Sequence, residues 1–280
     1  MKKSYKDIKV LIIGDSCFDV FTYGQTLRLA PEGPAPVFNP LRKITNGGMA
    51  LNVQKNIEAI GVAADLITQK ESIHKERFID ERTNTLLLRV DNNDKASRIE
   101  RSILEGIKNN CYLGIHYDAI IISDYCKGFL TEEDIDEISK YNFNIFLDTK
   151  KILGEWCKYV SFIKINHVEY DRTKHTIDEI GIYDQMIITR SDEGCEYKNI
   201  LYPVEKVNIK DVSGAGDTFI SGLVCEYVAS KEIIKAIKFA QYCATIVVQK
   251  KGVCTIWIWK NTMRCILRFI QIKFAEDCTF

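Results

Sequence analysis

The chain has 280 residues, of which 46% are apolar, and its 38 Lys and Arg balance its 38 Asp and Glu. This apolar content excludes a disordered chain, and the length suits one large α/β domain or two small ones. The zero net charge gives no overall field that would favour a nucleic acid or an acidic membrane surface, although a local pocket can still bind a small anion.

Short apolar runs rich in β-branched residues alternate with helical patterns along most of the chain. The predicted strands are Val10–Ile13, Ala64–Thr68, Ala119–Ser123, Ile145–Asp148, Phe162–Ile165 and Met186–Thr189. The predicted helices are Met49–Ile60, Ala96–Asn109, Thr131–Lys140, Lys151–Lys158, His167–Thr173, Thr218–Ala229 and Lys231–Val248. Continuous apolar strands that alternate with helices predict a parallel sheet covered by helices on both faces.

Polar residues directly follow several of these strands. They are Asp15, Asp124, Asp148, Asn166 and Arg190. Ligands of open α/β sheets bind at the carboxyl edge of the strands, so we expect these side chains to gather at a ligand site.

Two stretches interrupt the alternation of strands and helices. Phe21–Asn39 contains the segment Pro31-Glu-Gly-Pro-Ala-Pro36, and Thr83–Val90 is a β-rich run after a charged stretch. We predict that both supply strands of a small lid, about 21–39 and 83–90, beside the main domain. A long surface loop with an edge strand is the alternative.

The segment with the most specific chemistry is Asp211-Val-Ser-Gly-Ala-Gly-Asp-Thr-Phe219, which leads into a helical pattern. Gly214, Ala215 and Gly216 at a helix start can turn backbone N–H groups towards one point and form an anion hole suited to a phosphoryl group. Asp217, in the first helical turn, should be stabilised as a carboxylate and stay ionised at neutral pH. It would orient a hydroxyl group and take its proton late in phosphoryl transfer.

Read whole, this segment resembles the D-[TV]-[TS]-G-A-G-D-x-F signature of the PfkB, ribokinase-like carbohydrate kinases. The resemblance implies a single kinase domain over residues 1–280, with a three-layer α/β/α fold, a mainly parallel central sheet and a small β lid. It also implies ATP as the phosphoryl donor, Mg²⁺ as cofactor and Asp217 as the catalytic base. A need for a monovalent cation stays open.

Two later segments match the nucleotide side of the same family. Asn166-His-Val-Glu169 resembles the family's N-x-x-E element, which organises Mg²⁺ and phosphate through water; an amide and a carboxylate at this spacing face the same side of a helical turn. Ser191-Asp-Glu-Gly194 stands at the family's G-E-x-G turn. The resemblance therefore places nucleotide contacts at Asn166, Thr189, Arg190, Ser191 and Gly194, and a water-mediated metal contact at Glu169.

Two earlier segments match the family's sugar side. Gly14-Asp-Ser-Cys-Phe-Asp19 places Asp15 and Asp19 where carboxylates can accept hydrogen bonds from sugar hydroxyls, the alternatives being a turn former and a solvated residue. Gly47, Gly48 and Asn52 resemble the family's G-G-x-x-N element, at which the backbone approaches the sugar closely. The spacing departs from the pattern, so either Met49 replaces the second glycine or the turn has one residue more.

Within the family, the chain is most similar to the heptose 7-phosphate kinase domain of ADP-heptose synthesis proteins. Gly14–Asn39 resembles its GDxxLDxYxxGxxxRxSPExPxPV pattern, and Ser123–Gly128 resembles SDYxKG. The implied reaction transfers the γ-phosphate of ATP to the C1 hydroxyl of a heptose 7-phosphate, with Lys127 and Arg28 as contacts of the substrate's phosphate. A kinase of another sugar or nucleoside and a non-catalytic sugar- or nucleotide-binding relative remain alternatives.

The chain also departs from the family at several points. It is shorter between Ile67 and Glu81, and Ser191 and Cys126 stand where the family has glycines. Beyond Thr255 the sequence differs from the family's ending, where adenine contacts are expected. We expect these changes to affect nucleotide affinity and substrate identity more than the fold.

The cysteines and the apolar runs indicate the cellular compartment of the protein. None of the ten cysteines forms a Cys-x-x-Cys pair, so we interpret them as small buried residues in a reducing cytosol. The run Val10–Ile13 is too short for a signal peptide, and Val253–Phe274 carries too many basic residues for a membrane span. We predict a cytoplasmic protein with a small sugar or sugar phosphate as partner and neither nucleic acid nor membrane. The resemblance to the PfkB family implies a homodimer joined through the lid strands. No His-x-Gly-His element occurs, so we expect any nucleotidyltransferase to be a separate chain.

Overall fold

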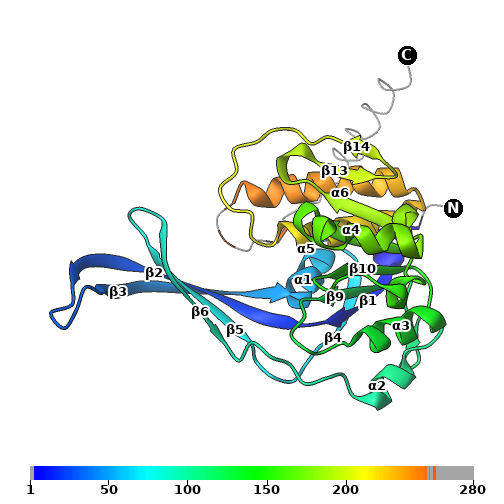
Figure 1. Cartoon of the computed structure of the whole chain (residues 1–280), viewed down its shortest axis with the longest axis horizontal. Helices are drawn as coiled ribbons and strands as arrows, with labels where there is room; N and C mark the ends of the chain where they lie inside the picture. The colour runs from blue at the N-terminus through cyan, green and yellow to red at the C-terminus, as the bar shows by residue number, and fades with distance from the viewer. Residues whose placement is uncertain (1–2, 251, 253–254, 257–280) are drawn as a thin grey trace.

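The computed structural model describes residues 3–250, 252, 255 and 256. This part of the chain forms a central sheet between helices and a long arm that projects from it (Figure 1). No helix within it is long and apolar enough to cross a membrane. Most of the apolar-rich stretch Val253–Phe274 lies outside the described residues, and so do the expected adenine contacts after residue 256.

The central sheet has the strand order β14-β13-β12-β11-β10-β9-β1-β4 in the described chain. Neighbouring strands from β4 to β12 are parallel, and β13 and β14 extend one edge in antiparallel pairing. The strands are β1 Lys9–Gly14, β4 Ala63–Ile67, β9 Ala119–Asp124, β10 Ile145–Thr149, β11 Phe162–Asn166, β12 Met186–Thr189, β13 Cys195–Tyr197 and β14 Ile200–Tyr202. Every strand predicted for this sheet is present, within one residue at its ends.

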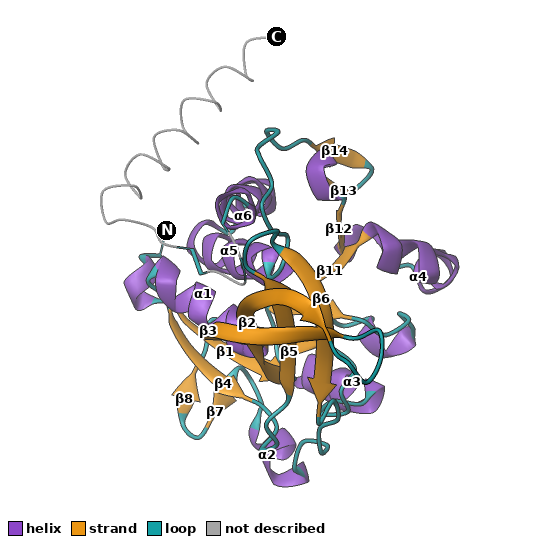
Figure 2. Ribbon diagram, turned by 90° about the vertical axis from the view of Figure 1, so that its left-hand side faces the viewer, coloured by secondary structure: helices purple, strands orange, loops and turns teal. Residues whose placement is uncertain are grey.

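Helices cover both faces of the sheet (Figure 2). The helices on one face are α1 (Ala50–Ile60), α5 (Ala215–Ser230) and α6 (Ile233–Val248), and those on the other are α2 (Arg101–Gly106), α3 (Glu132–Tyr141) and α4 (His167–Ile180). Successive side chains of β1 alternate between these layers: Val10 and Ile12 pack under the first set, Leu11 and Ile13 under the second. This is the three-layer α/β fold that the sequence predicted.

The predicted helix Lys151–Lys158 is wrong. The chain forms only a 3₁₀ turn, η2, at Glu155–Cys157. Gly154 lies in the middle of the predicted helix with an extended backbone (φ −156°), and glycine is a poor helix former. At the start of the stretch, the ammonium of Lys151 bonds to Asp124 (2.7 Å), which holds these residues against the sheet.

Two other helices differ in length from their predictions. The predicted Ala96–Asn109 shrinks to α2, because Ala96 and Ile99 donate their N–H groups to carbonyls of the loop after β9 (2.7 and 2.8 Å). Conversely, α4 continues well past Thr173 to Ile180 and ends at Gly181, whose left-handed φ of 69° is typical of a helix terminus.

The projecting arm is a second sheet, here called the lid, with the strand order β3-β2-β5-β6. Its strands are β2 Ser16–Leu29, β3 Pro36–Met49, β5 His74–Asp80 and β6 Thr85–Asn92. The two predicted stretches lie in this sheet, but β2 and β3 are longer than predicted and His74–Asp80 was missed. Its charged start, His-Lys-Glu-Arg, reads as a loop in the sequence, yet strands whose two faces both reach water can carry charges at every position.

Smaller elements complete the described chain. They are the strands β7 Cys111–Tyr112 and β8 Ile115–His116 and the 3₁₀ turns η1 Tyr5–Asp7, η3 Tyr183–Gln185 and η4 Ser191–Glu193. Of the described cysteines, five are buried as expected, Cys111 is half-buried and Cys126 is exposed.

The lid joins the main domain at the carboxyl edge of the central sheet. β1 ends at Gly14 and β2 begins at Ser16, while β3 ends at Met49 directly before α1. The start of α5 reaches the same edge. The polar residues that follow the parallel strands, the root of the lid and the Gly-Ala-Gly-Asp segment therefore meet in one place.

Candidate active site

Asp217 is the centre of this meeting point. It lies in the first turn of α5 and is only 4% exposed. The Asn52 amide on α1 donates a hydrogen bond to its Oδ2 (2.8 Å), and the Tyr125 hydroxyl donates one to its Oδ1 (2.6 Å). The carboxylate is thus fixed by donors from two different elements. Asn52 was predicted to bind the sugar, whereas here it orients the predicted base.

The environment of Asp217 sets its acidity. Burial raises the pKa of Asp217 to about 6, while the hydrogen bonds from Tyr125 and Asn52 oppose that rise. Loss of water on burial therefore opposes the stabilisation expected from the helix N-terminus. With a pKa near 6 the group is still mostly ionised at pH 7, and it is a stronger base than an exposed aspartate.

The Gly214–Gly216 segment forms the turn that starts α5. Gly214 has φ 79°, a left-handed conformation that favours glycine, and it precedes the first helical residue. The N–H of Ala215 donates to the Val212 carbonyl (3.2 Å), whereas those of Gly216 and Asp217 have no partner within the helix and are available to an anion. A Cβ on Gly216 would lie 2.8 Å from the Lys164 ammonium, which therefore stands directly beside this turn.

Lys164 was not singled out by the sequence analysis. It is 3% exposed on β11, and its ammonium bonds to Asp148 Oδ2 on β10 (2.7 Å). A lysine inside the otherwise apolar strand Phe-Ile-Lys-Ile is the signal that could have identified it. Lys150 was missed too: its ammonium contacts Glu169 and lies 5.2 Å from the centre of the Tyr125 ring.

Asn166 and Glu169 form a reciprocal capping box at the start of α4. The Asn166 side chain accepts the Glu169 N–H, and the Glu169 carboxylate accepts the Asn166 N–H, both at 2.9 Å. The two side chains do share one helical turn, as expected from their spacing. In the described chain no group of three or more His, Cys, Asp or Glu forms a ready-made metal cage. Their water-mediated metal role stays a prediction.

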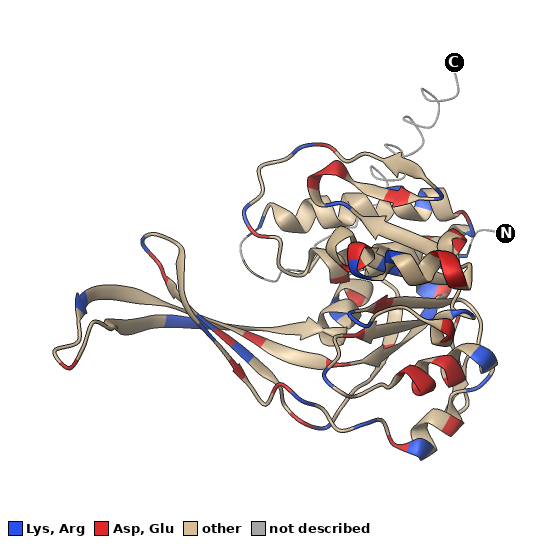
Figure 3. Ribbon diagram, in the orientation of Figure 1, with Lys and Arg blue, Asp and Glu red and all other residues tan. Residues whose placement is uncertain are grey.

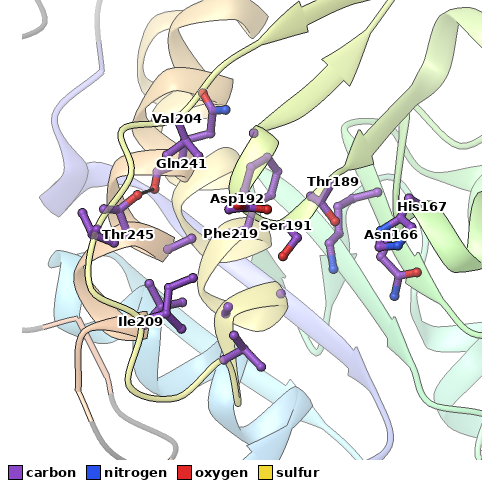
Figure 4. A pocket seen from close by; sticks show the side chains of 18 of the residues that line it. Asn166, His167, Thr189, Ser191, Asp192, Val204, Ile209, Phe219, Gln241 and Thr245 are labelled. Carbon is purple, nitrogen blue, oxygen red and sulfur yellow. Dashed lines mark hydrogen bonds between the residues drawn. The ribbon is translucent and has the colours of Figure 1, made fainter.

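A pocket of about 570 Å³ opens beside the anion hole (Figure 4). Ala215 and Gly216 line it together with Lys150 and Lys164. Its opposite wall is apolar and comes from the loop after β14, from α5 and from α6; it consists of Val204, Val207, Ile209, Val212, Phe219, Ala244 and Val248. Cations at one end and apolar side chains at the other suit a ligand with phosphates and a flat base.

The predicted nucleotide residues divide at this pocket. Asn166, Thr189, Ser191 and Gly194 line it, and Figure 4 shows three of them facing Gln241 and Thr245 across the space. Arg190 does not line the pocket, and its side chain forms an ion pair with Glu196 (2.7 Å).

Three of the non-glycine residues with a left-handed backbone lie in segments that resemble family motifs. Ser191 and Cys126, which replace glycines of the family pattern, have φ 54° and 57°. Met49 also has φ 57°, and the pairing of β2 with β3 runs without a bulge from Cys17↔Gly48 to Ser16↔Met49. The left-handed backbone at Met49 favours the alternative in which Met49 stands for the second glycine, and that assignment stays a prediction.

The predicted sugar residues occupy different positions around the lid root. Asp15 accepts N–H groups of the loop after β9, from Tyr125 (2.7 Å), Lys127 (3.2 Å) and Phe129 (3.3 Å). It is 1% exposed, and burial raises its pKa. Asp15 thus shapes the loop that carries Tyr125.

Asp19 lies against the glycine turn. Its Oδ2 would be 2.1 Å from a Cβ on Gly48, and its Oδ1 accepts a hydrogen bond from Arg77 (2.5 Å). Gly47 is equally tight, since a Cβ there would meet Leu51 at 2.6 Å. Both glycines therefore allow a close approach that no other residue would permit.

Lys127 and Arg28, the predicted phosphate contacts, are not brought together. The Lys127 ammonium bonds to Asp94 (2.5 Å) near the lid root. Arg28 is exposed and lies one residue before the outer end of β2, at the tip of the lid (Figure 1). Arg28 is therefore remote from the Asp217 site of its own chain.

Comparison with known proteins agrees with this geometry. Residues 146–260 match the family model for pfkB family carbohydrate kinase. The bifunctional protein HldE of Rhodopseudomonas palustris (strain TIE-1) is 27% identical over 88% of this chain, and that of Vibrio vulnificus (strain YJ016) is 27% identical over 90%. The chain spans only 61% and 62% of the lengths of these two relatives.

Solved structures show the same fold at low sequence identity. Ribokinase of Thermotoga maritima has a TM-score of 0.67 at 15% identity, covering 88% of this chain and 94% of that one. Phosphofructokinase-2 of Escherichia coli in complex with fructose-6-phosphate has a TM-score of 0.64 at 13% identity, covering 86% and 93%. The fold is ribokinase-like, and residues 146–260 are similar to the pfkB family carbohydrate kinases.

Proposed function

We propose that this protein transfers the γ-phosphate of ATP to a hydroxyl of a phosphorylated sugar, with C1 of a heptose 7-phosphate as the first candidate. The observation that carries the proposal is the position of Asp217. Its buried carboxylate lies between an anion hole with an adjoining pocket on one side and the root of the lid on the other. A phosphoryl donor and a sugar acceptor would meet at this carboxylate.

The pocket residues suit a nucleotide donor. The apolar wall between the loop after β14 and α6 would hold the base, and the phosphates would extend towards the start of α5. There the free N–H groups and the Lys164 ammonium would stabilise charge on the transferred phosphoryl group. Asp217 would orient the sugar hydroxyl and accept its proton, and its pKa of about 6 suits that task near neutral pH.

The residues around the anion hole also fit a hydrated Mg²⁺. Mg²⁺ keeps several waters and binds through few protein carboxylates. Asp148 Oδ1 is a buried oxygen without a hydrogen-bond partner in the described chain, and Asn166 and Glu169 lie at the adjacent start of α4. These three residues would hold the ion through water, and the ion would neutralise phosphate charge.

The choice of acceptor follows from the relatives. A phosphofructokinase-2 in complex with fructose-6-phosphate shares the fold, and the sequence resembles heptose 7-phosphate kinases; both favour an acceptor that already carries a phosphate. A ribokinase of Arabidopsis thaliana complexed with ribose and ATP shares the fold and supports the alternative of an unphosphorylated sugar. A non-catalytic role is disfavoured because Asp217 and the Gly214–Gly216 turn are intact.

The lid supports assembly into a homodimer. Its strands expose large apolar side chains to solvent: Leu27 (66%), Leu29 (63%), Leu41 (57%), Leu86 (54%) and Leu88 (55%). A second copy that covers these side chains would remove apolar surface from water and so lower the free energy of the pair. Mass measurement in solution should therefore give twice the chain mass, and replacing Leu86 and Leu88 by serine should give monomers. A wild-type monomer at all concentrations would refute the dimer.

The activity test is ADP release with ATP and Mg²⁺ on a panel of acceptors. The panel contains heptose 7-phosphate, sedoheptulose 7-phosphate, fructose 6-phosphate, ribose and adenosine. We expect turnover on a phosphorylated heptose. Turnover on ribose or adenosine alone would keep the kinase and discard the heptose, whereas no turnover with ATP still bound would favour the non-catalytic relative.

A further inference from the structure

The lid root carries a set of cations that sequence reasoning left largely unexplained. Strand register places Asp19, Lys75 and Asp91 side by side across β2, β5 and β6. Two residues further along β5, on the same face, Arg77 pairs with Arg89. Residues paired in this way point to the same face of a sheet. Figure 3 shows basic and acidic residues close together on these strands.

Lys127 of the main domain belongs to the same group. It lies in the loop after β9 and pairs with Asp94, whose other oxygen is 4.0 Å from the Lys75 ammonium. We call Lys75, Arg77, Arg89 and Lys127 the cation cluster. The cluster thus lies where the lid meets the loop that carries Tyr125.

Lys75 is the member with the weakest partner. Only 9% of it is exposed, and its ion pair with Asp94 is 4.0 Å long, beyond hydrogen-bond distance. Burial and the cations Lys127 and Arg89 lower its pKa, while Asp94 opposes them. A mostly buried ammonium with so distant a partner has lost water and gained little in return, which costs free energy.

The other members each have a carboxylate of their own. Arg77 bonds to Asp19 (2.5 Å), Lys127 to Asp94 (2.5 Å), and Arg89 bonds to Asp91 through two nitrogens (2.7 and 2.8 Å). With these pairs formed, Lys75 is the surplus positive charge of the cluster. Four cations thus share three carboxylates, Asp19, Asp91 and Asp94, and the excess of positive charge favours a further anion.

The cluster lies next to the catalytic base. Cys17 packs with Met49, Ile73 and Tyr125, and its thiol is 3.9 Å from Asp19 Oδ2. Burial and the negative charges of Asp19 and Asp217 raise the pKa of this thiol to about 12, while the positive charge of Lys75 opposes them. Tyr125, which packs with Cys17, donates a hydrogen bond to Asp217 (2.6 Å), so the thiol and this tyrosine connect the lid root with the base. The nucleotide pocket reaches the same base from the other side, along Tyr125 and Gly216.

We propose that Lys75, supported by Arg77, Arg89 and Lys127, binds the phosphate that the acceptor sugar already carries. The inference rests on the proposed kinase function and extends it by locating the group that selects phosphorylated over unphosphorylated sugars. A phosphate monoester dianion would supply the acceptor oxygens that the Lys75 ammonium lacks. The two ends of the sugar would then be held separately, its phosphate at the lid root and its reacting hydroxyl at Asp217.

The test compares Lys75→Met with Lys95→Met, a control substitution at an exposed lysine of the segment after β6. Kinetics would be measured with sedoheptulose 7-phosphate and with unphosphorylated sedoheptulose. We expect Lys75→Met to raise KM for the phosphorylated sugar by about ten- to a hundredfold, the range for a lost charge-assisted hydrogen bond. KM for ATP and kinetics with the unphosphorylated sugar should change less than about twofold, as should all constants of Lys95→Met. Equal losses with both sugars would overturn the proposal, because they would indicate a structural role.

Calorimetric binding of sedoheptulose 7-phosphate without ATP separates this inference from the kinase proposal. Binding that disappears in Lys75→Met supports the phosphate site even if wild type shows no turnover. Binding that is equal in wild type and Lys75→Met overturns it even if wild type is an active kinase. Melting temperatures of both variants show whether either has lost its fold.

Discussion

The two sides of the Asp217 site are built differently. On the nucleotide side, the pocket consists of helix-start N–H groups, a glycine turn and apolar side chains, with Lys164 and Lys150 at one end. On the sugar side, the lid root consists of charged side chains in paired rows, with few apolar contacts between them. Backbone N–H groups and apolar surface distinguish little between one nucleotide and another. Charged side chains at fixed positions favour an acceptor whose own charges match them.

The difference between the two sides is consistent with the range of residues that matches the family model. The family model matches residues 146–260, which include the nucleotide pocket and Asp217 but not the lid. A turn that requires glycine constrains the sequence tightly, whereas a pattern of charges on a two-faced sheet can shift from strand to strand. We therefore expect relatives with different substrates to differ in sequence mainly on the sugar side.

The largest expected effect comes from Asp217, where the two sides meet. Asp217→Asn should lower kcat by about a hundred- to ten-thousandfold, the usual contribution of a general base. ATP affinity should stay within about threefold of wild type in a binding titration. A loss of less than tenfold in kcat would show that Asp217 does not take the proton.

The same substitution should stabilise the fold at neutral pH. The pKa of Asp217 is about 6 in the folded chain and lower in the unfolded one, so folding favours the protonated form and ionisation opposes folding. The stability penalty is absent well below pH 4 and complete above pH 6. Thermal melts should show that Asp217→Asn raises Tm relative to wild type more at pH 8 than at pH 4.

A methyl group at Gly216 tests the nucleotide side alone. The Cβ of Gly216→Ala would lie 2.8 Å from the Lys164 ammonium, so the lysine must move away from the anion hole. We expect kcat/KM for ATP to fall by about tenfold, from the loss of a single charge-assisted interaction. Binding of the sugar in the absence of ATP should be unchanged. Equal losses on both sides would break the distinction between them.

Removal of the Tyr125 hydroxyl should shift the pH profile of turnover. The hydrogen bond from Tyr125 lowers the pKa of Asp217, so Tyr125→Phe should raise that pKa above 6. The acid limb of the kcat profile should then move to higher pH. Turnover should drop several-fold at pH 6 and largely recover at pH 8. A profile that superimposes on wild type would mean that this hydrogen bond is absent during turnover.

The smallest effects concern the residues that replace glycines. Ser191→Gly and Cys126→Gly should each raise the free energy of unfolding by up to about 1 kcal/mol, because left-handed backbone costs a non-glycine residue more than glycine loses in chain entropy. Gly194→Ala is the opposite control, since its Cβ would lie 2.1 Å from the Tyr202 carbonyl and its φ is 111°. Urea denaturation of the three variants would measure these differences. A loss of stability in both glycine variants would contradict the idea that the left-handed backbone at Ser191 and Cys126 is strained.

Sequence reasoning reached the central sheet and the base but not the whole site. Apolar runs such as Val10–Ile13 have a period and a length that predict buried strands, and the Gly-Ala-Gly-Asp segment is specific enough to identify Asp217. Lys75 was missed because its charged strand reads as a loop, and Lys164 because a lysine within an apolar strand does not by itself show what it binds. For both lysines the partner has to be known, and these partners, Asp94 and Asp148, are distant in sequence.

The acidity of Asp217 was missed for a related reason. Helix position is local and can be read from the sequence, whereas burial depends on the packing of α1 and the loop after β9 around the carboxylate. The same holds for Arg28, which belongs to a recognisable motif yet lies at the tip of the lid. Only the length of β2 and β3 in three dimensions shows how far that position is from the site.

The central claim is that a donor on the nucleotide side and an acceptor on the sugar side exchange a phosphoryl group at Asp217. Phosphorus NMR of a mixture of ATP, Mg²⁺ and sedoheptulose 7-phosphate tests it most directly. We expect the γ-phosphate resonance to be replaced by a second sugar-phosphate resonance in an amount equal to the ADP formed, and no such change with Asp217→Asn. Unchanged ATP, or inorganic phosphate released equally by wild type and variant, would contradict the account.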